Sequence, residues 1–278
     1  MNDKVKVIAE IGINHQGNFE LMKKMMLAAK KCGVDYVKSQ KREPKVCLTE
    51  EQYNRIYDSP NSFGKTYGEH KENLEFSVEQ WEELQKYAEK INVKMFMSVF
   101  DEVSADKMNN LGMELFKIGS AEVTKLSLLE QVKSFNKPII ISSGMSTIEE
   151  IDKAMDVLKG SDVTLMQCTS SYPSKETEVH LNVLKTYQDR YGVPVGLSGH
   201  YINGSGAIEA AAVAMGAQWI ERHFTLDRTM KGTDQSASLE KIGMRNVVKS
   251  VRVVERAMGG FNKQVLKSEI PIREKCRG

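Results

Sequence analysis

Two histidines at the ends of apolar runs are the residues with the clearest capacity for chemistry. The stretch AQWIERHFTLD, residues 217–227, is an apolar run that breaks into Glu221, Arg222 and His223. His200 ends the preceding apolar run, VGLSGH. Because buried charges are tolerated once they are paired, this pattern is compatible with a structural ion pair. It is equally compatible with a metal or anion site, since paired imidazoles near carboxylates suit a divalent transition metal ion.

Lys38 and Lys117 are a second chemical signal because each lies in a short, otherwise apolar run. An unpaired buried ammonium group is costly, so each lysine requires an anion. That anion is either a nearby carboxylate of the chain or a phosphate or carboxylate of a ligand. Serines after several apolar runs, and the turn HYINGSG before a helical segment, add donors of the kind that bind oxyanions. These features predict a small, strongly anionic substrate beside a metal ion.

The elements that carry these residues alternate regularly along the chain. Amphipathic segments such as LMKKMMLAAKKCG and VEQWEELQKYAEK follow short β-rich runs. Eight such units predict an α/β protein, a single-domain (β/α)8 TIM barrel over residues 1–278, with an open doubly wound sheet as the structural alternative. The expected strands are 5–12, 36–40, 94–99, 115–120, 138–143, 163–168, 195–200 and 219–224.

Two further segments complete this organisation. A long irregular loop is expected from about residue 41 to 77, after the second strand, and a short tail over 267–278. A loop of this length in a compact domain is usually functional or mobile.

The strand ends of such a barrel should form the active site, because catalytic side chains gather at the carboxyl ends of the strands. Since side chains alternate along a strand, Glu221 and His223 should share one face and Arg222 should point away, toward the helices. His200 and His223 end consecutive strands and should be neighbours, with Glu10 across the barrel. Polar residues end all eight expected strands: Glu10, Lys38, Gln40, Ser98, Lys117, Ser120, Glu122, Ser142, Ser143, Thr169, Tyr172, Ser198, His200, Glu221 and His223.

Composition argues against several other classes of protein. Lys and Arg number 39 against 37 Asp and Glu, and no basic run indicates a nucleic-acid partner. No apolar stretch reaches the ~20 residues that span a bilayer, and the N-terminus reads as a strand rather than a signal peptide, so no membrane partner is expected. The four cysteines lack CxxC spacing, which favours free thiols and a cytoplasmic location.

A set of motifs resembles the sialic acid synthase family from about residue 6 to 266, in family order. The motifs are AEIGINHQGN, VKSQ, GKTYGEHKENLEFS, FKIGSAE, ISSGMST, QCTSSYP, GLSGH and ERHFTLDRTMKGTDQSASLE. GKTYGEHK and TLDRTMKGTDQSASLE resemble the branch with animal sialic acid synthases and bacterial nonulosonate synthases. The resemblance implies a (β/α)8 barrel. It also implies condensation of phosphoenolpyruvate with an open-chain N-acylmannosamine-type aldose, free or 6-phosphorylated, to a nine-carbon 2-keto acid and phosphate.

The resemblance also implies residue roles. His200 and His223 would hold a divalent metal ion, Mn2+ first, with Mg2+ or Co2+ as alternatives, and Glu10 would lie near it. Ser170 stands where some bacterial relatives carry Asn, in contact with phosphate. The phosphoenolpyruvate positions would be Lys38, Ser98, Lys117, Ser120, Ser142 and Ser198, and the sugar positions Gln40, Glu122, Tyr172 and Asp234. The proton-transfer candidates are Glu10 and Glu122.

The long loop has two interpretations. FGKTYGEHKENLEF is either a solvated lid or a segment in which Lys65, His70 and Lys71 grip the far end of the sugar, including a terminal phosphate.

One departure from the family pattern concerns the C-terminus. Family members commonly continue into a small antifreeze-like domain, which in a dimer lends an Arg to the partner's sugar pocket. This chain ends at REKCRG, about where that linker begins, so the sequence holds the barrel domain only, and the second domain is either naturally absent or cut off. The resemblance to the family implies a homodimer.

Two rival functions are compatible with the residues. One is an aldolase that forms a Schiff base through Lys117 or Lys38. The other is a non-catalytic sugar-binding paralogue.

Overall fold

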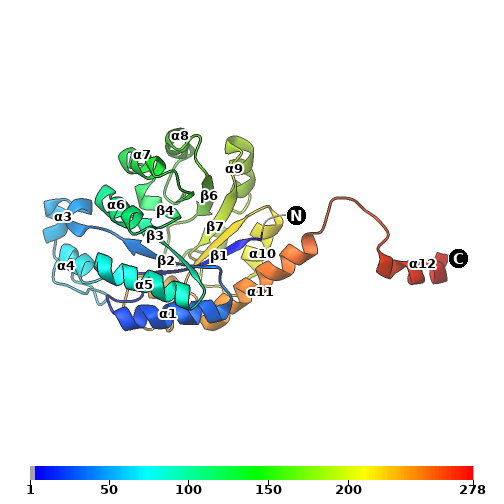
Figure 1. Cartoon of the computed structure of the whole chain (residues 1–278), viewed down its shortest axis with the longest axis horizontal. Coiled ribbons are helices and arrows are strands. Elements are labelled where there is room, and N and C mark those ends of the chain that lie inside the picture. The colour runs from blue at the N-terminus through cyan, green and yellow to red at the C-terminus, as the bar shows by residue number, and fades with distance from the viewer. Residues whose placement is uncertain (1–3, 278) are drawn as a thin grey trace.

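Eight parallel strands close into a barrel in the computed structural model, which describes residues 4–277 (Figure 1). Each strand pairs with the next along the chain, and β8 pairs with β1. The predicted (β/α)8 barrel is therefore confirmed, and the open doubly wound alternative is wrong because the sheet has no edge. The strands are β1 (Lys6–Gly12), β2 (Tyr36–Lys41), β3 (Lys94–Val99), β4 (Phe116–Ile118), β5 (Ile139–Ser142), β6 (Val163–Cys168), β7 (Val195–Gly199) and β8 (Trp219–His223).

Helices between the strands form the outer layer of the barrel (Figure 1). Local sequence signals explain several of their ends. Asn18 accepts a hydrogen bond from the Leu21 N–H at the start of α1, and Gly33 ends that helix with a φ of 90°. The main helices are α1 (Phe19–Cys32), α5 (Val78–Lys90), α6 (Glu102–Asn110), α7 (Leu126–Ser134), α8 (Ile148–Val157), α9 (Val183–Tyr191), α10 (Ala207–Ala214) and α11 (Lys241–Met258).

The apolar core has two parts. The larger part fills the layer between strands and helices and includes the buried face of α1. The smaller part plugs the barrel interior with Ile8, Phe96, Leu115, Ile140 and Met166. Each plug residue is followed two positions later by a side chain on the same face of the sheet. These side chains are Glu10, Ser98, Lys117, Ser142 and Cys168. The plug thus supports the polar strand ends from below.

The segment between β2 and α5, residues 42–77, contains three short helices: α2 (Pro44–Cys47), α3 (Glu50–Asn54) and α4 (Tyr67–Glu72). We call it the β2–α5 segment. The prediction of an irregular loop was wrong in this respect, because Thr49 and Thr66 each form a capping box that starts a helix. In Figure 1, α3 and α4 lie together at one end of the molecule, far from the C-terminal tail.

Short 3-10 helices and a C-terminal helix complete the fold. The predicted fourth strand, 115–120, is shorter than expected because the chain turns into η1 (Ser120–Glu122) directly after Gly119. After α11 the chain is exposed and leads to α12 (Ile270–Arg277), which stands apart from the barrel in Figure 1. The remaining 3-10 helices are η2 (Glu176–Glu178), η3 (Gln235–Ala237) and η4 (Lys267–Glu269). Within residues 4–277, no helix combines the length and apolarity that crossing a membrane requires.

Candidate active site

The carboxyl ends of the strands surround a cavity of about 270 Å³, which we call the inner cavity. Every strand contributes to its wall, either directly or through the loop that follows. The structure therefore brings most of the predicted site residues into one place. Those that line the inner cavity are Glu10, Lys38, Gln40, Ser98, Lys117, Ser120, Glu122, Ser142, Ser170, Tyr172, Ser198, His200 and His223.

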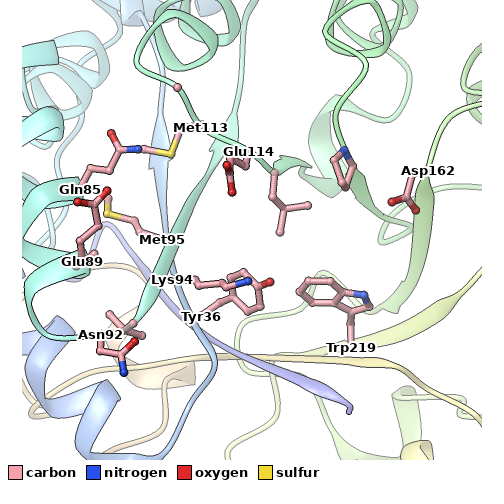
Figure 2. Close-up of a pocket in the computed structure, with 15 residues that line it drawn as sticks. Tyr36, Gln85, Glu89, Asn92, Lys94, Met95, Met113, Glu114, Asp162 and Trp219 are labelled. Atoms are coloured by element: carbon pink, nitrogen blue, oxygen red, sulfur yellow. The ribbon is translucent and has the colours of Figure 1, made fainter. Parts of the chain in front are cut away.

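A larger cavity, of about 740 Å³, lies at the opposite end of the barrel. Its floor contains Tyr36, Lys94 and Trp219, the first residues of β2, β3 and β8, with the two aromatic rings 5.2 Å apart (Figure 2). None of the predicted site residues line it. Because catalysis in (β/α)8 barrels occurs at the carboxyl ends of the strands, the inner cavity is the better candidate despite its smaller volume.

Four buried charges cross the floor of the inner cavity as an alternating network. The Lys38 Nζ atom lies 2.8 Å from Glu10 Oε2 and 3.6 Å from Glu221 Oε1. The Lys117 Nζ atom lies 3.0 Å from Glu221 Oε2. Lys38 also donates a hydrogen bond of 2.7 Å to Ser98 Oγ. Both lysines thus have carboxylate partners, one of the two arrangements that the sequence predicted.

The protonation of this network follows from burial and pairing. Burial raises the pKa of Glu221, but Lys117 and Lys38 outweigh it and lower that pKa to about 2. At Glu10 burial dominates over Lys38 and raises the pKa. Burial lowers the pKa of Lys117, whereas at Lys38 the two carboxylates outweigh burial and raise the pKa. Lys38 and Glu221 are therefore the fixed charges at the centre of the network.

His200 and His223 are neighbours at the barrel mouth, with ring centroids 5.2 Å apart. The Tyr172 ring packs against both, at 4.1 Å from His200 and 5.8 Å from His223. His200 Nδ1 lies 2.7 Å from the Thr169 carbonyl oxygen, which fixes this nitrogen as a donor. Burial lowers the pKa of His200, but Cys168 and the Thr169 carbonyl outweigh it and raise that pKa; when the ring is neutral, Nε2 is its open nitrogen. Burial lowers the pKa of His223 to about 3, so its ring is neutral at pH 7.

Another cavity, of about 340 Å³, adjoins the inner cavity and shares Gln40, Glu122, Tyr172 and His223 with it. We call it the outer cavity. The β2–α5 segment forms part of its wall. The residues that line only the outer cavity include Arg42, Cys47, Tyr67, Lys71, Lys125, Thr233 and Asp234. The predicted sugar-side residues Asp234 and Lys71 are therefore placed here rather than in the inner cavity.

Two residues predicted to grip the sugar line neither cavity. Lys65 has an exposed side chain, and its backbone N–H is bonded to Glu69. His70 is buried, but its Nδ1 accepts a 3.1 Å hydrogen bond from the Phe63 N–H. His70 thus holds the β2–α5 segment together instead of facing the cavity.

Glu122 forms part of the wall between the two cavities. It is buried, and burial raises the pKa of its carboxyl group to about 7, against the opposing effects of Lys125 and Arg42. The Lys125 Nζ atom lies 3.9 Å from Glu122 Oε1, while Oε2 has no hydrogen-bond partner among the described residues. A carboxyl group with a pKa near neutrality is suited to giving or taking a proton at physiological pH.

Comparisons with known proteins identify the family. The NeuB family matches residues 25–263. The chain belongs to the NeuB family. N-acetylneuraminate-9-phosphate synthase of Homo sapiens is 42% identical over 272 residues, which cover 97% of this chain and 75% of the human protein. N,N'-diacetyllegionaminic acid synthase of Campylobacter jejuni is 36% identical over 272 residues, 96% of this chain and 81% of that one.

Solved structures agree with this assignment. N-acetylneuraminic acid synthetase from Leptospira borgpetersenii, in complex with citrate, matches with a TM-score of 0.84 at 28% identity, over 99% of this chain and 93% of that one. The predicted resemblance to the sialic acid synthases is therefore confirmed, and so is the prediction that the chain is a synthase of this class.

The histidine pair of this NeuB-family chain fits a divalent metal ion with open coordination positions. His223 Nδ1 is buried without a hydrogen-bond partner among the described residues. It lies 3.8 Å from Asp234 Oδ2. No three His, Cys, Asp or Glu side chains within residues 4–277 form a cluster that could hold a metal ion. The site is therefore smaller than a closed protein metal site, and an ion held here would have two imidazole ligands and open positions for water or substrate.

Glu10 was expected across the barrel from the histidines, and this was wrong. It pairs in register with His223, because closure of the barrel makes β1 the neighbour of β8. On its other side Glu10 pairs in register with Lys38, and its Oε1 accepts a 3.1 Å hydrogen bond from Gln40. Glu10 therefore joins the charged network to the histidine pair.

Arg222 has the structural role that strand alternation predicted. It points out of the barrel, where it forms an ion pair with Glu209 of α10 and donates to the carbonyl groups of Gly199 and Tyr201. Its guanidinium group lies 3.9 Å from the Tyr201 ring centroid. The charged triplet at the end of β8 thus divides, with two residues in the site and one in the core.

Sequence reasoning missed several residues of these cavities, and two of them, Cys168 and Arg42, had a usable signal. Cys168 ends β6 with its Sγ 3.5 Å from Ser120 Oγ and 3.9 Å from His200 Nδ1. Burial raises the pKa of this thiol, but His200 and Lys117 outweigh it and lower the pKa to about 7. Its position two residues after the plug residue Met166 was a usable signal. Arg42 follows Gln40 by two residues and offered the same signal.

Proposed function

We propose that the chain condenses phosphoenolpyruvate with an open-chain N-acylmannosamine-type aldose, free or 6-phosphorylated, to give a nine-carbon 2-keto acid and phosphate. The observation that supports this most is the inner cavity, where two ammonium groups, several serine hydroxyls and two neighbouring imidazoles converge. The named activities of the relatives support the same reaction class. The adjoining outer cavity supplies room for the second substrate.

Phosphoenolpyruvate would occupy the inner cavity. Lys38 and Lys117 would neutralise its phosphate and carboxylate, which otherwise repel an approaching electron-rich partner. Ser142 Oγ and Ser170 Oγ are buried and have no hydrogen-bond partner among the described residues. Two hydroxyl groups in this state are available as donors to phosphate oxygens, in agreement with the expected roles of both serines. Ser98, Ser120 and Ser198 would add hydroxyl groups around the same anion.

His200 and His223 would hold the divalent ion, with Mn2+ favoured over Mg2+ or Co2+. Such an ion supplies Lewis-acid polarisation of a carbonyl group. The chain itself orients both rings: the Thr169 carbonyl fixes the His200 tautomer, and Tyr172 packs against both imidazoles. A neutral His223 suits this role, since metal ligands must be deprotonated.

The bond changes can be assigned to groups of the chain. C3 of phosphoenolpyruvate forms the new bond to the aldehyde carbon, and the resulting alkoxide takes a proton. Glu122 is suited to give that proton, because its carboxyl group faces both cavities and burial raises its pKa to about 7. Water adds to C2, the C2–O bond to phosphate breaks, and phosphate leaves. Glu10, beside His223, would accept the proton from that water.

The aldose would lie in the outer cavity, with Gln40, Tyr172 and Asp234 around it. The three carbons of phosphoenolpyruvate add at C1, so C6 of the aldose becomes C9 of the product. The relative from Homo sapiens is named for a 9-phosphate and the one from Campylobacter jejuni for a diacetylated sugar acid without phosphate. Both kinds of aldose are therefore part of the proposal. A cytoplasmic homodimer stays a prediction.

Phosphate release and mass spectrometry of the product test this function. Purified protein would be mixed with phosphoenolpyruvate, Mn2+ and each of N-acetylmannosamine, its 6-phosphate, mannose 6-phosphate and a diacetamido-trideoxyhexose. We expect phosphate and a nine-carbon 2-keto acid from at least one N-acylated aldose. No turnover with the whole panel would refute the proposal. Borohydride trapping of a substrate on lysine, with activity that survives chelation, would favour the Schiff-base aldolase instead.

The metal role has its own test. His223→Ala should abolish turnover and weaken Mn2+ binding, measured by electron paramagnetic resonance, with an unchanged circular dichroism spectrum. Chelation of the unmodified protein should stop turnover, and added Mn2+ should restore it. Full activity of the variant, or of the chelated protein, would show that the two imidazoles do not serve a metal ion.

A further inference from the structure

The wall of the outer cavity contains more basic than acidic residues. At its inner end it reaches His223 and Asp234, next to the position proposed for the reacting aldehyde. Three cationic residues, Arg42, Lys71 and Lys125, line the outer cavity but not the inner one. Lys125 lies 3.9 Å from Glu122, and Arg42 shares Glu75 with Lys41. A neutral sugar would therefore leave these cations only partly compensated, and an anionic group on the ligand would complete the compensation.

Lys71 is the cation with the least compensation. It lies on α4, and none of the carboxylates in residues 4–277 is within the 4.0 Å that defines an ion pair with its ammonium group. Its Nζ atom instead lies 5.1 Å from the Tyr67 ring centroid. Burial and the nearby Arg42 together lower the pKa of Lys71 to about 8, against the opposing effects of Asp234 and Glu75. An anion that enters the cavity would relieve both effects.

Arg42 is the second cation and is only 7% exposed. Its guanidinium group stacks over the Phe100 ring at 3.9 Å and donates to Gln40 Oε1. Its Nε atom has no hydrogen-bond partner among the described residues, and the nearest carboxylate, Glu75, is 3.8 Å away. Glu75 is also shared with Lys41 at 3.1 Å. A buried guanidinium group with an unused donor is suited to a phosphate, whose oxygens accept several hydrogen bonds at once.

We infer that Arg42 and Lys71 form a phosphate subsite, which selects an aldose that carries a terminal phosphate. This inference rests on the proposed function and refines it by naming the substrate class. The aldehyde end of the aldose lies toward His223, and the phosphate lies at the other side of the outer cavity, against α4. A phosphomonoester carries close to two negative charges at neutral pH, which suits one cation without an ion pair, Lys71, and one that shares its carboxylate with Lys41, Arg42. Lys65, six residues before Lys71, takes no part because its side chain is outside the cavity.

The test compares kcat/KM for N-acetylmannosamine 6-phosphate and for N-acetylmannosamine, followed by phosphoenolpyruvate consumption. The unmodified protein should prefer the phosphorylated aldose at least tenfold. Lys71→Gln should lower kcat/KM for the phosphorylated aldose by about 10- to 100-fold, the loss expected for one charge-assisted hydrogen bond, and change that for the free sugar less than about threefold. Arg42→Gln provides a second variant. Because Arg42 also donates to Gln40, its readout is the ratio of the two kcat/KM values, in which the preference for the phosphorylated aldose should fall at least tenfold.

Lys45→Gln is the matched control, because it removes the same charge from an exposed side chain of the β2–α5 segment that lines neither cavity. It should leave both rates within about twofold. Equal rates of the unmodified protein with the two aldoses, or an equal loss of both in Lys71→Gln, would overturn the subsite.

Calorimetric titration separates this inference from the proposed function. N-acetylmannosamine 6-phosphate should bind the unmodified protein and bind Lys71→Gln at least tenfold more weakly. That result would support the subsite even if phosphoenolpyruvate were not consumed, in which case only the proposed reaction would fail. Equal binding to both proteins would refute the subsite whether or not the reaction occurs.

Discussion

The replacement Glu221→Gln gives a direct test of the charged network at the barrel mouth. The Glu221 carboxylate is buried and lies 3.0 Å from the Lys117 ammonium and 3.6 Å from that of Lys38. The amide has nearly the same shape but no charge. Lys38 would keep Glu10 at 2.8 Å. Lys117 would lose its ion pair with Glu221, the one carboxylate paired with it among the described residues.

The size of the effect follows from that difference. Removal of one partner from a buried ion pair costs about 3–5 kcal/mol, because the other charge remains buried. The amide oxygen still accepts a neutral hydrogen bond worth about 1 kcal/mol, so the expected loss is near the lower end, about 3 kcal/mol. At about 2–4 °C per kcal/mol for a large domain, Tm should fall by about 6–12 °C.

Urea unfolding at pH 7, followed by circular dichroism, measures the change in the free energy of unfolding. Asp152→Asn is the control, because Asp152 pairs with Arg190 at the surface and its loss should cost at most about 1 kcal/mol. The double variant Glu221→Gln, Lys117→Met should be more stable than Glu221→Gln alone, since it no longer buries an unpaired ammonium group.

Two outcomes would refute this reasoning. A loss no larger than that of Asp152→Asn would mean that water in the inner cavity solvates Lys117 well enough to replace the carboxylate. A double variant that is less stable than Glu221→Gln would mean that Lys117 stabilises the barrel by packing rather than by charge. Either result would remove the argument that Lys117 requires an anion.

Three further predictions concern protonation, packing of the β2–α5 segment and the outward ion pair. Because burial raises the pKa of Glu122 to about 7, its contribution to stability is complete below about pH 4.5 and is lost as the pH rises through 7. The free energy of unfolding, measured with urea from pH 4.5 to 8, should decline in the unmodified protein and decline less in Glu122→Gln. An equal decline in the two proteins would contradict the raised pKa of Glu122. Gly68→Ala would bring a Cβ within 2.3 Å of the Tyr53 ring. The free energy of unfolding should therefore fall by about 1–3 kcal/mol, and proteolysis between residues 42 and 77 should become faster. Unchanged stability and proteolysis would show that the ring moves aside without cost. Arg222→Met should lower the free energy of unfolding by about 3–5 kcal/mol, because the Glu209 carboxylate is left buried without its ion-pair partner. A free energy of unfolding within about 1 kcal/mol of that of the unmodified protein would show that the ion pair does not stabilise the fold.

The barrel could be predicted from sequence because its signals are local. Each strand is a short β-rich run, and side-chain alternation alone puts Glu221 and His223 on the face opposite to Arg222. The pairing of His200 with His223 followed from the order of two consecutive strands. These inferences need only neighbours along the chain and one rule about where barrels carry their active sites.

The position of Glu10 does not follow from neighbours along the chain, but from closure of the predicted barrel, which was not applied to it. Its neighbour His223 is more than two hundred residues away in the sequence, and only closure of the sheet between β1 and β8 brings them into register. The same holds for Lys117 and Glu221, whose side chains meet inside the barrel from β4 and β8. Which buried cation meets which carboxylate is set by three-dimensional packing, and alternation along single strands does not determine it.

The contrast between Lys65 and Lys71 shows where a local signal was present and unused. Both belong to GKTYGEHK, and both were assigned to the sugar. In the same motif Thr66 and Glu69 have the spacing of a capping box, which starts α4 at Tyr67. Lys65 therefore precedes the cap. Its backbone N–H donates a hydrogen bond to the Glu69 carboxylate, and its side chain is exposed. Lys71 stands on the helix itself, so a helix start that was readable from the sequence already separated the two lysines. That Lys71 faces the cavity beside Arg42 still depends on how α4 packs against the barrel, and this packing is what gives the outer cavity its cationic side.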